Sequence, residues 1–491
     1  MEEEYIKLIL GLKLKQIRTD KNLSLFGLSK LTGLSKSYLN EIEKGKKYPK
    51  TDKIVLLSEA LDTPYDQLVS LKLDKNLAPI GEILKSKILK EIPLNLFGIQ
   101  ESDLIDIISE APAKVNAFIS TIIKIAQNYN FSKESFYLAS LRSYQEANNN
   151  YFENIEKQVQ DFTKSYHIDV TKPIEAKELE EILIEEYGYV IDEKELDKHN
   201  ELHNLRSVFV PQTKTLLLAK HMDDAQKVFI FGKEIAYNYL DFKERLYTFS
   251  WIKFENFEQV LNNFYASYFA GALLVNQQSI NKDINALFNK KSFDKDLFSK
   301  ILNKYNASPE TFFQRLTNVL PSEFNITNLF FLRFTHKKGS FKYHLNKELH
   351  LAHQHSPHAN ETNEHYCRRW VSLKVLNEIT EKNIPVFDLQ ISHYPLDNFS
   401  YAVLSSATKD PFRDDYFRSI SIGILIDKQS KRKINFLDDP NILTNDVAVT
   451  CESCSIKNCA ERVAEPINIE KQVTNEVIEK VVSELNQKFS K

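Results

Sequence analysis

The stretch that decides the fold of the N-terminal part is GLKLKQIRTDKNLSLFGLSKLTGLSKSYLNEIEKG, residues 11–45. Apolar residues recur in it at helical spacing in three runs, and a serine precedes the second and the third. Ser24 and Ser35 are therefore expected to cap helices over 25–31 and 36–44. Gly33 suits the turn between these helices and Gly45 the end of the third, because a left-handed backbone angle is cheapest without a Cβ. This spacing predicts a helix-turn-helix.

The third predicted helix has the pattern of a helix that reads DNA. Leu39 and Ile42 would face the core, so the polar side chains between them would face base edges. From Gly11 to Lys53 there are eleven Lys or Arg against four Asp or Glu, a local charge of +7 in a chain of net charge −3. Such a face indicates phosphate contacts, although a solvated basic surface would give the same pattern. The predicted DNA-binding residues are Ser24, Lys30, Ser35, Lys36, Ser37, Tyr38, Asn40, Lys44 and Lys46.

These residues resemble a helix-turn-helix of the Xre/Cro type. The family often has Gln just after the cap of the second helix, where this chain has Leu25. One contact that positions the DNA backbone is therefore not expected here, and the operator cannot be copied from relatives. The resemblance is carried by Gly11-Leu12-x-Leu14-x-x-x-Arg18, Leu28, Gly33-Leu34-Ser35 and Ile42-Glu43-x-Gly45-x-x-x-Pro49.

Length and composition set limits on the remainder of the chain. Its 491 residues are enough for about three domains. The acidic start, Met1-Glu2-Glu3-Glu4, is unlike a signal peptide, and no apolar run approaches the ~20 residues that span a bilayer. Four cysteines argue against a disulfide framework. The chain is expected to be soluble and cytoplasmic.

Residues 227–240 resemble the helix of ImmA/IrrE-type metallopeptidases that carries His-Glu-x-x-His. Such a helix binds zinc with two histidines one turn apart and uses the glutamate as a base. The corresponding residues here are Lys233, Glu234 and Tyr237, and the family's third ligand position falls near Tyr265. A protonated lysine would repel zinc. We therefore expect a degenerate peptidase scaffold and no enzyme activity.

All four cysteines lie in the C-terminal part. Cys451, Cys454 and Cys459 are clustered, and Cys367 lies upstream. Together they could make a four-sulfur shell for one metal centre, whereas four buried reduced thiols are the simpler alternative. Three close cysteines with a remote fourth favour a [4Fe–4S] cluster, with zinc as the alternative.

Two other groups in this region could bind ligands. Six histidines are predicted to lie in a solvated, turn-rich loop, in which only His365 is close enough to a cysteine to orient it. A cation–aromatic set suits a phosphate- and base-bearing ligand such as coenzyme A, but could equally brace the cysteine loop. The histidines are His344, His350, His353, His355, His358 and His365, and the ligand-binding set is Arg333, Arg368, Arg369 and Trp370.

The order of parts resembles the short-chain fatty acid regulator family of bacterial transcription factors. The matching segments are Tyr144-Gln-Glu-x-x-Asn149-x-Tyr151-Phe152, Cys367-Arg-Arg-Trp370, Gln390-Ile-Ser392 and Thr450-Cys-Glu-x-Cys454-x4-Cys459-x-x-Arg462. The resemblance implies a DNA-binding regulator of propionate, acetate or glyoxylate metabolism that senses acyl-CoA esters, carries an iron–sulfur cluster and forms a dimer or higher oligomer. A redox- or iron-responsive regulator without a small ligand, and a zinc endopeptidase anti-repressor, remain alternatives.

The expected fold class is multidomain: an all-α helix-turn-helix domain, a helical connector, an α+β peptidase-like domain and an α+β C-terminal domain. The expected bounds are 1–72, 73–166 (linker and oligomerisation region), 167–307 and 308–491. The connector is expected to include one long helix around 144–166, whose aromatic residues Tyr151, Phe152 and Phe162 would be core or, less commonly, a dimer seam. An amphipathic helix is expected at 469–489.

Overall fold

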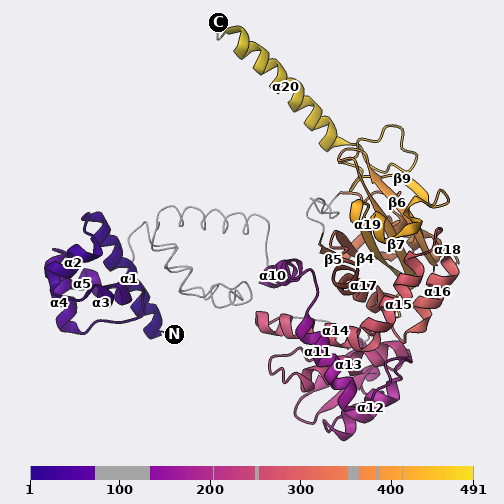
Figure 1. Cartoon of the computed structure of the whole chain (residues 1–491), viewed down its shortest axis with the longest axis horizontal. Coiled ribbons are helices and arrows are strands. Elements are labelled where there is room, and N and C mark those ends of the chain that lie inside the picture. The colour runs from indigo at the N-terminus through magenta and orange to yellow at the C-terminus, as the bar shows by residue number, and fades with distance from the viewer. Residues whose placement is uncertain are drawn as a thin grey trace. The chain divides into compact units, whose positions relative to one another are not determined.

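The structure, a computed structural model, describes residues 2–71, 133–202, 204–248, 254–351, 364–382, 386–411 and 413–489 (Figure 1). The chain forms two compact units, one of residues 1–144 with 255–257 and one of 145–254 with 258–491. An all-helical N-terminal part is followed by helices and two sheets, which confirms the multidomain fold class. Of the predicted linker and connector over 73–166, residues 73–132 lie outside the described residues.

Within residues 2–71, helices pack around one small apolar core to which each helix contributes a buried leucine. These side chains are Leu14, Leu28, Leu39, Leu57 and Leu68. The helices are α1 (Glu2–Asp20), α2 (Leu25–Thr32), α3 (Lys36–Glu43), α4 (Thr51–Ala60) and α5 (Tyr65–Val69). Gly11 lets α1 approach α3 closely, because a Cβ on it would lie 2.4 Å from the carbonyl oxygen of Ile42.

The single long helix predicted around 144–166 is wrong. The structure has α10 (Lys133–Ala147) and α11 (Glu153–Ser165), separated by a turn. Asn149 and Asn150 take left-handed φ angles of 49° and 51° there, a conformation that Asn tolerates better than most residues. Phe162 on α11 is fully buried against Tyr239 and Phe269. The interpretation of this aromatic residue as core is therefore confirmed, and α11 belongs to the second unit.

A small sheet flanked by helices follows. Its strand order is β1-β3-β2, with β1 parallel to β3 and β2 antiparallel to it. The antiparallel strands over 207–210 and 215–218 are formed by short apolar runs, Ser-Val-Phe-Val and Thr-Leu-Leu-Leu. The elements are α12 (Ala176–Glu185), β1 (Val190–Asp192), η2 (Leu196–Lys198), η3 (Asn200–Leu202), β2 (Ser207–Val210), β3 (Thr215–Leu218), α13 (Asp224–Tyr239) and α14 (Phe257–Leu274).

The C-terminal part is built on a six-stranded mixed sheet of order β5-β4-β8-β7-β6-β9, in which only the β6–β9 pair is parallel. Its strands are β4 (Leu329–Lys337), β5 (Tyr343–His350), β6 (Val386–Tyr394), β7 (Phe399–Lys409), β8 (Tyr416–Leu425) and β9 (Leu443–Asp446). The other elements are α15 (Gln277–Phe288), α16 (Lys295–Lys304), α17 (Pro309–Phe324), α18 (Val371–Lys382), α19 (Lys428–Lys433), η4 (Asn435–Asp438) and α20 (Ile467–Phe489).

The two faces of this sheet carry different helices. Phe330, Leu332 and Phe334 on β4 pack into one apolar core with α18. Because successive strand residues point to opposite faces, their neighbours on β4 face the other side, which α17 covers. This alternation determines which of the predicted ligand residues can lie together.

Two of the predicted loop histidines lie on a strand. His344 and His350 belong to β5, at the edge of the sheet, where alternate side chains remain exposed and a polar sequence is tolerated. His353, His355 and His358 lie outside the described residues. Across the described ranges, every helix is too short or too polar to span a bilayer.

Candidate functional site

The turn between α2 and α3 has the predicted geometry. Ser24 Oγ accepts a hydrogen bond from the Gly27 amide at 2.9 Å, and Ser35 Oγ accepts one from the Tyr38 amide at 3.2 Å. Gly33 ends α2 with a φ of 68°. Both serine hydroxyls thus cap helices, which fixes the direction of α3.

Helix α3 buries one side and presents a polar face. Leu39 and Ile42 are fully buried, whereas Lys36, Ser37 and Asn40 are exposed and Tyr38 is partly exposed. The three exposed side chains offer an ammonium, a hydroxyl and an amide. Such groups can form hydrogen bonds with base edges in the major groove and with the phosphates of the DNA backbone.

The other predicted contact residues surround this face. Lys30 is exposed on α2, with its ammonium 4.8 Å from the centre of the Phe26 ring. Lys46 is exposed after α3, and Lys44 is half-buried at its end. These lysines are placed to add sequence-independent attraction for phosphates.

Two cations counted in the basic face hold the fold instead. Arg18 Nε lies 2.6 Å from Glu43 Oε1, and Arg18 Nη2 donates to Glu43 Oε2 at 2.9 Å. The hydrogen bond with Glu43 raises the pKa of Arg18. Lys13 is buried and donates to the Gln67 carbonyl at 2.9 Å and to Ser70 Oγ at 2.8 Å. In the sequence Lys13 lies between Leu12 and Leu14, which are both buried, and these neighbours indicate that Lys13 is buried too.

The peptidase-like positions on α13 form a buried polar network. Lys233 donates to Asn263 Oδ1 at 2.6 Å, and Glu234 Oε2 lies 2.6 Å from Arg245 Nη2 and accepts from Tyr189 at 2.9 Å. Burial lowers the pKa of Lys233 to about 8, although Glu234 acts in the opposite direction. The residues predicted to correspond to the peptidase motif on α13 thus take part in an ion pair and a lysine–amide contact.

Of the remaining two peptidase-like positions, Tyr237 contacts that ion pair, since the Arg245 guanidinium lies 4.2 Å from the centre of its ring, and Tyr265 packs among aromatic side chains. Tyr237 is buried and donates to Asn263 Oδ1 at 3.3 Å. Tyr265 packs its ring against Phe152 and Phe242. Asn263, two residues earlier on α14, accepts hydrogen bonds from both Lys233 and Tyr237, a role that no sequence pattern predicted.

The cysteines are drawn together by backbone pairing. The Cys367 amide donates to the Val449 carbonyl at 3.1 Å, and the Cys451 amide donates to the His365 carbonyl at 2.8 Å. Burial raises the pKa of Cys367 to about 11, and the neighbouring Cys454 and Cys451 add to this. Among the described residues, however, no three His, Cys, Asp or Glu side chains are grouped as a metal site.

The loop that carries the other cysteines is held by polar contacts. Cys454 is buried and Cys459 is half-buried. Arg462 donates to the carbonyls of Cys451 at 3.2 Å and Ile456 at 2.7 Å. His365 Nδ1 lies 2.7 Å from Glu452 Oε1, so its side chain pairs with a carboxylate.

The predicted ligand-binding set is divided between the two faces of the large sheet. Arg333 Nη1 donates to Glu310 Oε1 at 3.0 Å on the α17 side. Trp370 is buried on the α18 side against Phe334, the strand neighbour of Arg333. Arg333 and Trp370 therefore cannot share one pocket.

Arg368 and Arg369 take part in bracing contacts. Arg368 Nη2 donates to the Phe341 carbonyl at 2.7 Å, and its guanidinium lies 4.3 Å from the centre of the Tyr343 ring. The Arg369 carbonyl accepts from Gln390 Nε2 at 3.1 Å. These contacts tie the segment to β5, to the residue Phe341 before it and to β6.

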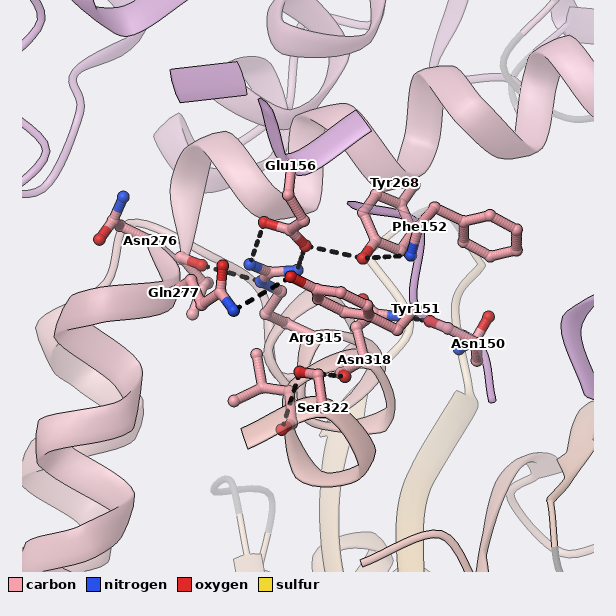
Figure 2. Close-up of polar contacts among 12 residues, drawn as sticks. Asn150, Tyr151, Phe152, Glu156, Tyr268, Asn276, Gln277, Arg315, Asn318 and Ser322 are labelled. Carbon is pink, nitrogen blue, oxygen red and sulfur yellow. Dashed lines mark hydrogen bonds and ion pairs between the residues drawn. The ribbon is translucent and has the colours of Figure 1, made fainter. Parts of the chain in front are cut away.

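Sequence reasoning missed a buried ion pair in the second unit. Figure 2 shows Glu156 of α11 facing Arg315 of α17, with Arg315 Nη2 donating to Glu156 Oε2 at 2.9 Å. Tyr268 of α14 donates to Glu156 Oε1 at 2.7 Å, and Arg315 Nε donates to the Val275 carbonyl at 3.0 Å. Arg315 is 1% exposed. The pair fastens three helices from distant parts of the chain.

Two capped helices, a glycine turn and an outward polar face on the second helix define a helix-turn-helix DNA-binding domain. Residues 14–68 match the family model HTH_3, described as Helix-turn-helix. No curated protein sequence matches the chain. A solved structure described as a Mycobacterium tuberculosis transcriptional regulator is 18% identical, with a TM-score of 0.46, over 66% of this chain and 92% of that one.

Proposed function

We propose that the chain is a sequence-specific DNA-binding transcription regulator that acts in the cytoplasm, with α3 as its reading helix. The observation that carries this proposal is the exposed set Lys36, Ser37 and Asn40 on a helix that is capped by Ser35 and anchored by two buried side chains. The HTH_3 match over residues 14–68 supports it.

A gel shift on the DNA upstream of its own gene, at stated salt, tests the proposal. Asn40→Ala is expected to lose about 1–3 kcal/mol on the specific site and little on unrelated DNA. Lys36→Ala is expected to weaken binding to both and to reduce the salt slope by about 1. Lys431→Ala, an exposed lysine on α19, is the matched control. Wild-type binding by both α3 variants would refute the role of α3.

We also propose that two copies pair through α20, which suits a reader of paired half-sites. The helix has no buried residue, and Ile478, Val482, Leu485 and Phe489 recur on it at spacings of four, three and four. Asn475 precedes them at the next such position. This is the pattern of a two-stranded coiled coil with a polar residue that fixes its register.

Light scattering on the full chain tests the pairing. Ile478→Asp with Leu485→Asp is expected to convert a dimer to a monomer, because the charges would face each other in the seam. Gln487→Asp, on the outer side of the helix, is expected to leave the mass unchanged. An unchanged dimer in the double variant would refute pairing through α20.

We propose further that the second unit senses an acyl-CoA ester. An apolar cavity of about 40 Å³ supports this, since it lies between α17 and the large sheet and is lined by Leu316, Leu320, Leu404, Ile422 and Ile424, among others. The side chains that line it are apolar, which suits the hydrocarbon tail of a short acyl group.

A gel shift titrated with propionyl-CoA and with free CoA tests the ligand. A change in DNA affinity with the ester alone is the expected result, because the ligand must favour one arrangement of the protein to act. No change with either compound would refute acyl-CoA sensing and leave cluster oxidation as the signal.

The four cysteines are proposed to hold a [4Fe–4S] cluster, with zinc as the alternative. Their thiols are suitable donors, and backbone pairing brings Cys367 beside Cys451, but the described side chains do not form a closed ligand set. When bound, the cluster would supply a redox-active group.

Iron, sulfide and zinc analysis of anaerobically purified protein tests the metal proposal. Cys454→Ser is expected to lose the metal while its DNA-binding domain stays folded. Full metal content in this variant would refute the four-cysteine site.

A further inference from the structure

Three cations lie side by side on the sheet face that α17 covers. Arg333 on β4 is the register partner of Lys347 on β5, and Arg418 on β8 is the partner of Thr335, two residues further along β4. Register partners, and every second residue of a strand, share a face. Like charges at opposite positions destabilise a sheet, so this arrangement needs an anion.

The structure supplies one carboxylate to the three cations. Glu310, near the start of α17, has its Oε1 3.0 Å from Arg333 Nη1 and 3.8 Å from Lys347 Nζ, and its Oε2 3.9 Å from Arg418 Nη1. Burial acts to raise the pKa of Glu310, but the cations, Arg333 foremost, lower it well below its ordinary value. Glu310 is therefore ionised, and one negative charge faces three positive ones.

A fourth cation lies near the cluster. Arg206, just before β2, has its pKa lowered to about 10, first by burial and then by Arg418. Asp410 also acts on Arg206, but it is paired with Arg413 at 2.9 Å.

The cluster also offers a spare donor and access to solvent. Arg333 Nε is buried and lacks a hydrogen-bond partner among the described residues. The Lys347 side chain is 48% exposed, so the cluster is open to solvent on that side.

We propose that Arg333, Lys347 and Arg418, with Arg206 beside them, bind the phosphate groups of a small ligand. Guanidinium forks fit phosphate oxygens in pairs, and the lysine adds a point charge at the entrance. The site lies in the second unit and is separate from DNA reading by α3. It does not depend on the ligand being an acyl-CoA ester. It gives Arg333 a role apart from Arg368, Arg369 and Trp370.

Titration calorimetry of the full chain, with sodium pyrophosphate at constant ionic strength, tests the site. Wild type is expected to bind pyrophosphate, and Lys347→Gln and Arg418→Gln are expected to bind it at least tenfold more weakly. Lys431→Gln, which removes an exposed lysine on α19, is expected to bind as wild type. Glu310→Gln is expected to bind several-fold more tightly, because the competing carboxylate is gone. A purely structural ion pair would not give that gain.

Two comparisons complete the experiment. Lys36→Ala is expected to keep pyrophosphate binding. Loss of binding in this variant would assign the anion to the DNA-binding face and overturn the proposal.

Free CoA that binds more tightly than pyrophosphate would identify a nucleotide-bearing ligand, and equal affinities would indicate a simple phosphate ester. The proposal would be refuted if wild type did not bind pyrophosphate. It would also be refuted if Lys347→Gln and Arg418→Gln bound pyrophosphate as tightly as wild type. A gel shift on the same samples reports DNA binding independently.

Discussion

At the scale of single residues, burial of Lys233 in the folded chain disfavours its charged form. It is 6% exposed, and its ammonium donates to Asn263. Burial lowers its pKa from 10.5 to about 8. Below pH 8 Lys233 is charged in both the folded and the unfolded chain, so the folded state bears the full free-energy cost of burying this charge. Between about pH 8 and 10.5 the folded chain loses the proton first, so stability rises by about 3 kcal/mol from this group.

Lys233→Met is expected to remove this rise. The free energy of unfolding in urea, measured from pH 7.5 to 10, should increase with pH more steeply in wild type than in the variant. Lys220→Met, which removes an exposed lysine, serves as the control and should follow wild type. Parallel curves for wild type and Lys233→Met would show that Lys233 is not penalised by burial.

At the scale of elements, the contact between α1 and α3 positions the reading helix. Gly11→Ala would place a Cβ 2.4 Å from the Ile42 carbonyl oxygen. Since backbone rather than a flexible side chain lies there, α1 must shift, and we expect a loss of about 1–3 kcal/mol. Gly27→Ala on α2 meets its nearest atom at 3.4 Å and should be neutral or stabilising.

Hydrogen exchange measured on the full chain reports this effect locally. Amides of α1 and α3 are expected to exchange faster in Gly11→Ala and at the wild-type rate or slower in Gly27→Ala. Equal protection of α1 and α3 in the two variants would contradict the close approach of these helices.

At the scale of the whole molecule, the Glu156–Arg315 pair joins α11 and α17 within the second unit. Arg315→Met leaves a buried carboxylate without its partner and is expected to cost about 3–5 kcal/mol. Glu156→Leu with Arg315→Met removes both charges, so it should be less destabilising than Arg315→Met alone. Thermal unfolding of the three proteins checks this order. A double variant less stable than the single one would mean that packing, rather than charge, dominates here.

Part of the fold and of the candidate site follows from local sequence signals. Ser24 and Ser35 cap their helices, and Gly33 makes the turn, because each acts on backbone groups within three residues of itself. The strands over 207–210 and 215–218 follow from short β-branched and apolar runs. The break at Asn149 and Asn150 was missed because apolar spacing continues across it, and an asparagine in a left-handed turn looks like any polar helix residue.

The sequence by itself determined the helix-turn-helix and the polar face of α3, since caps, turns and periodicity are local. The tertiary structure decided which cations are free to meet a ligand. Arg18 and Lys13 bind protein groups, and Arg333 lies across the sheet from Trp370. Arg315 meets Glu156, a residue 159 positions away. Such pairings depend on sheet register and helix packing between distant segments, and neither leaves a mark in the local spacing of residues.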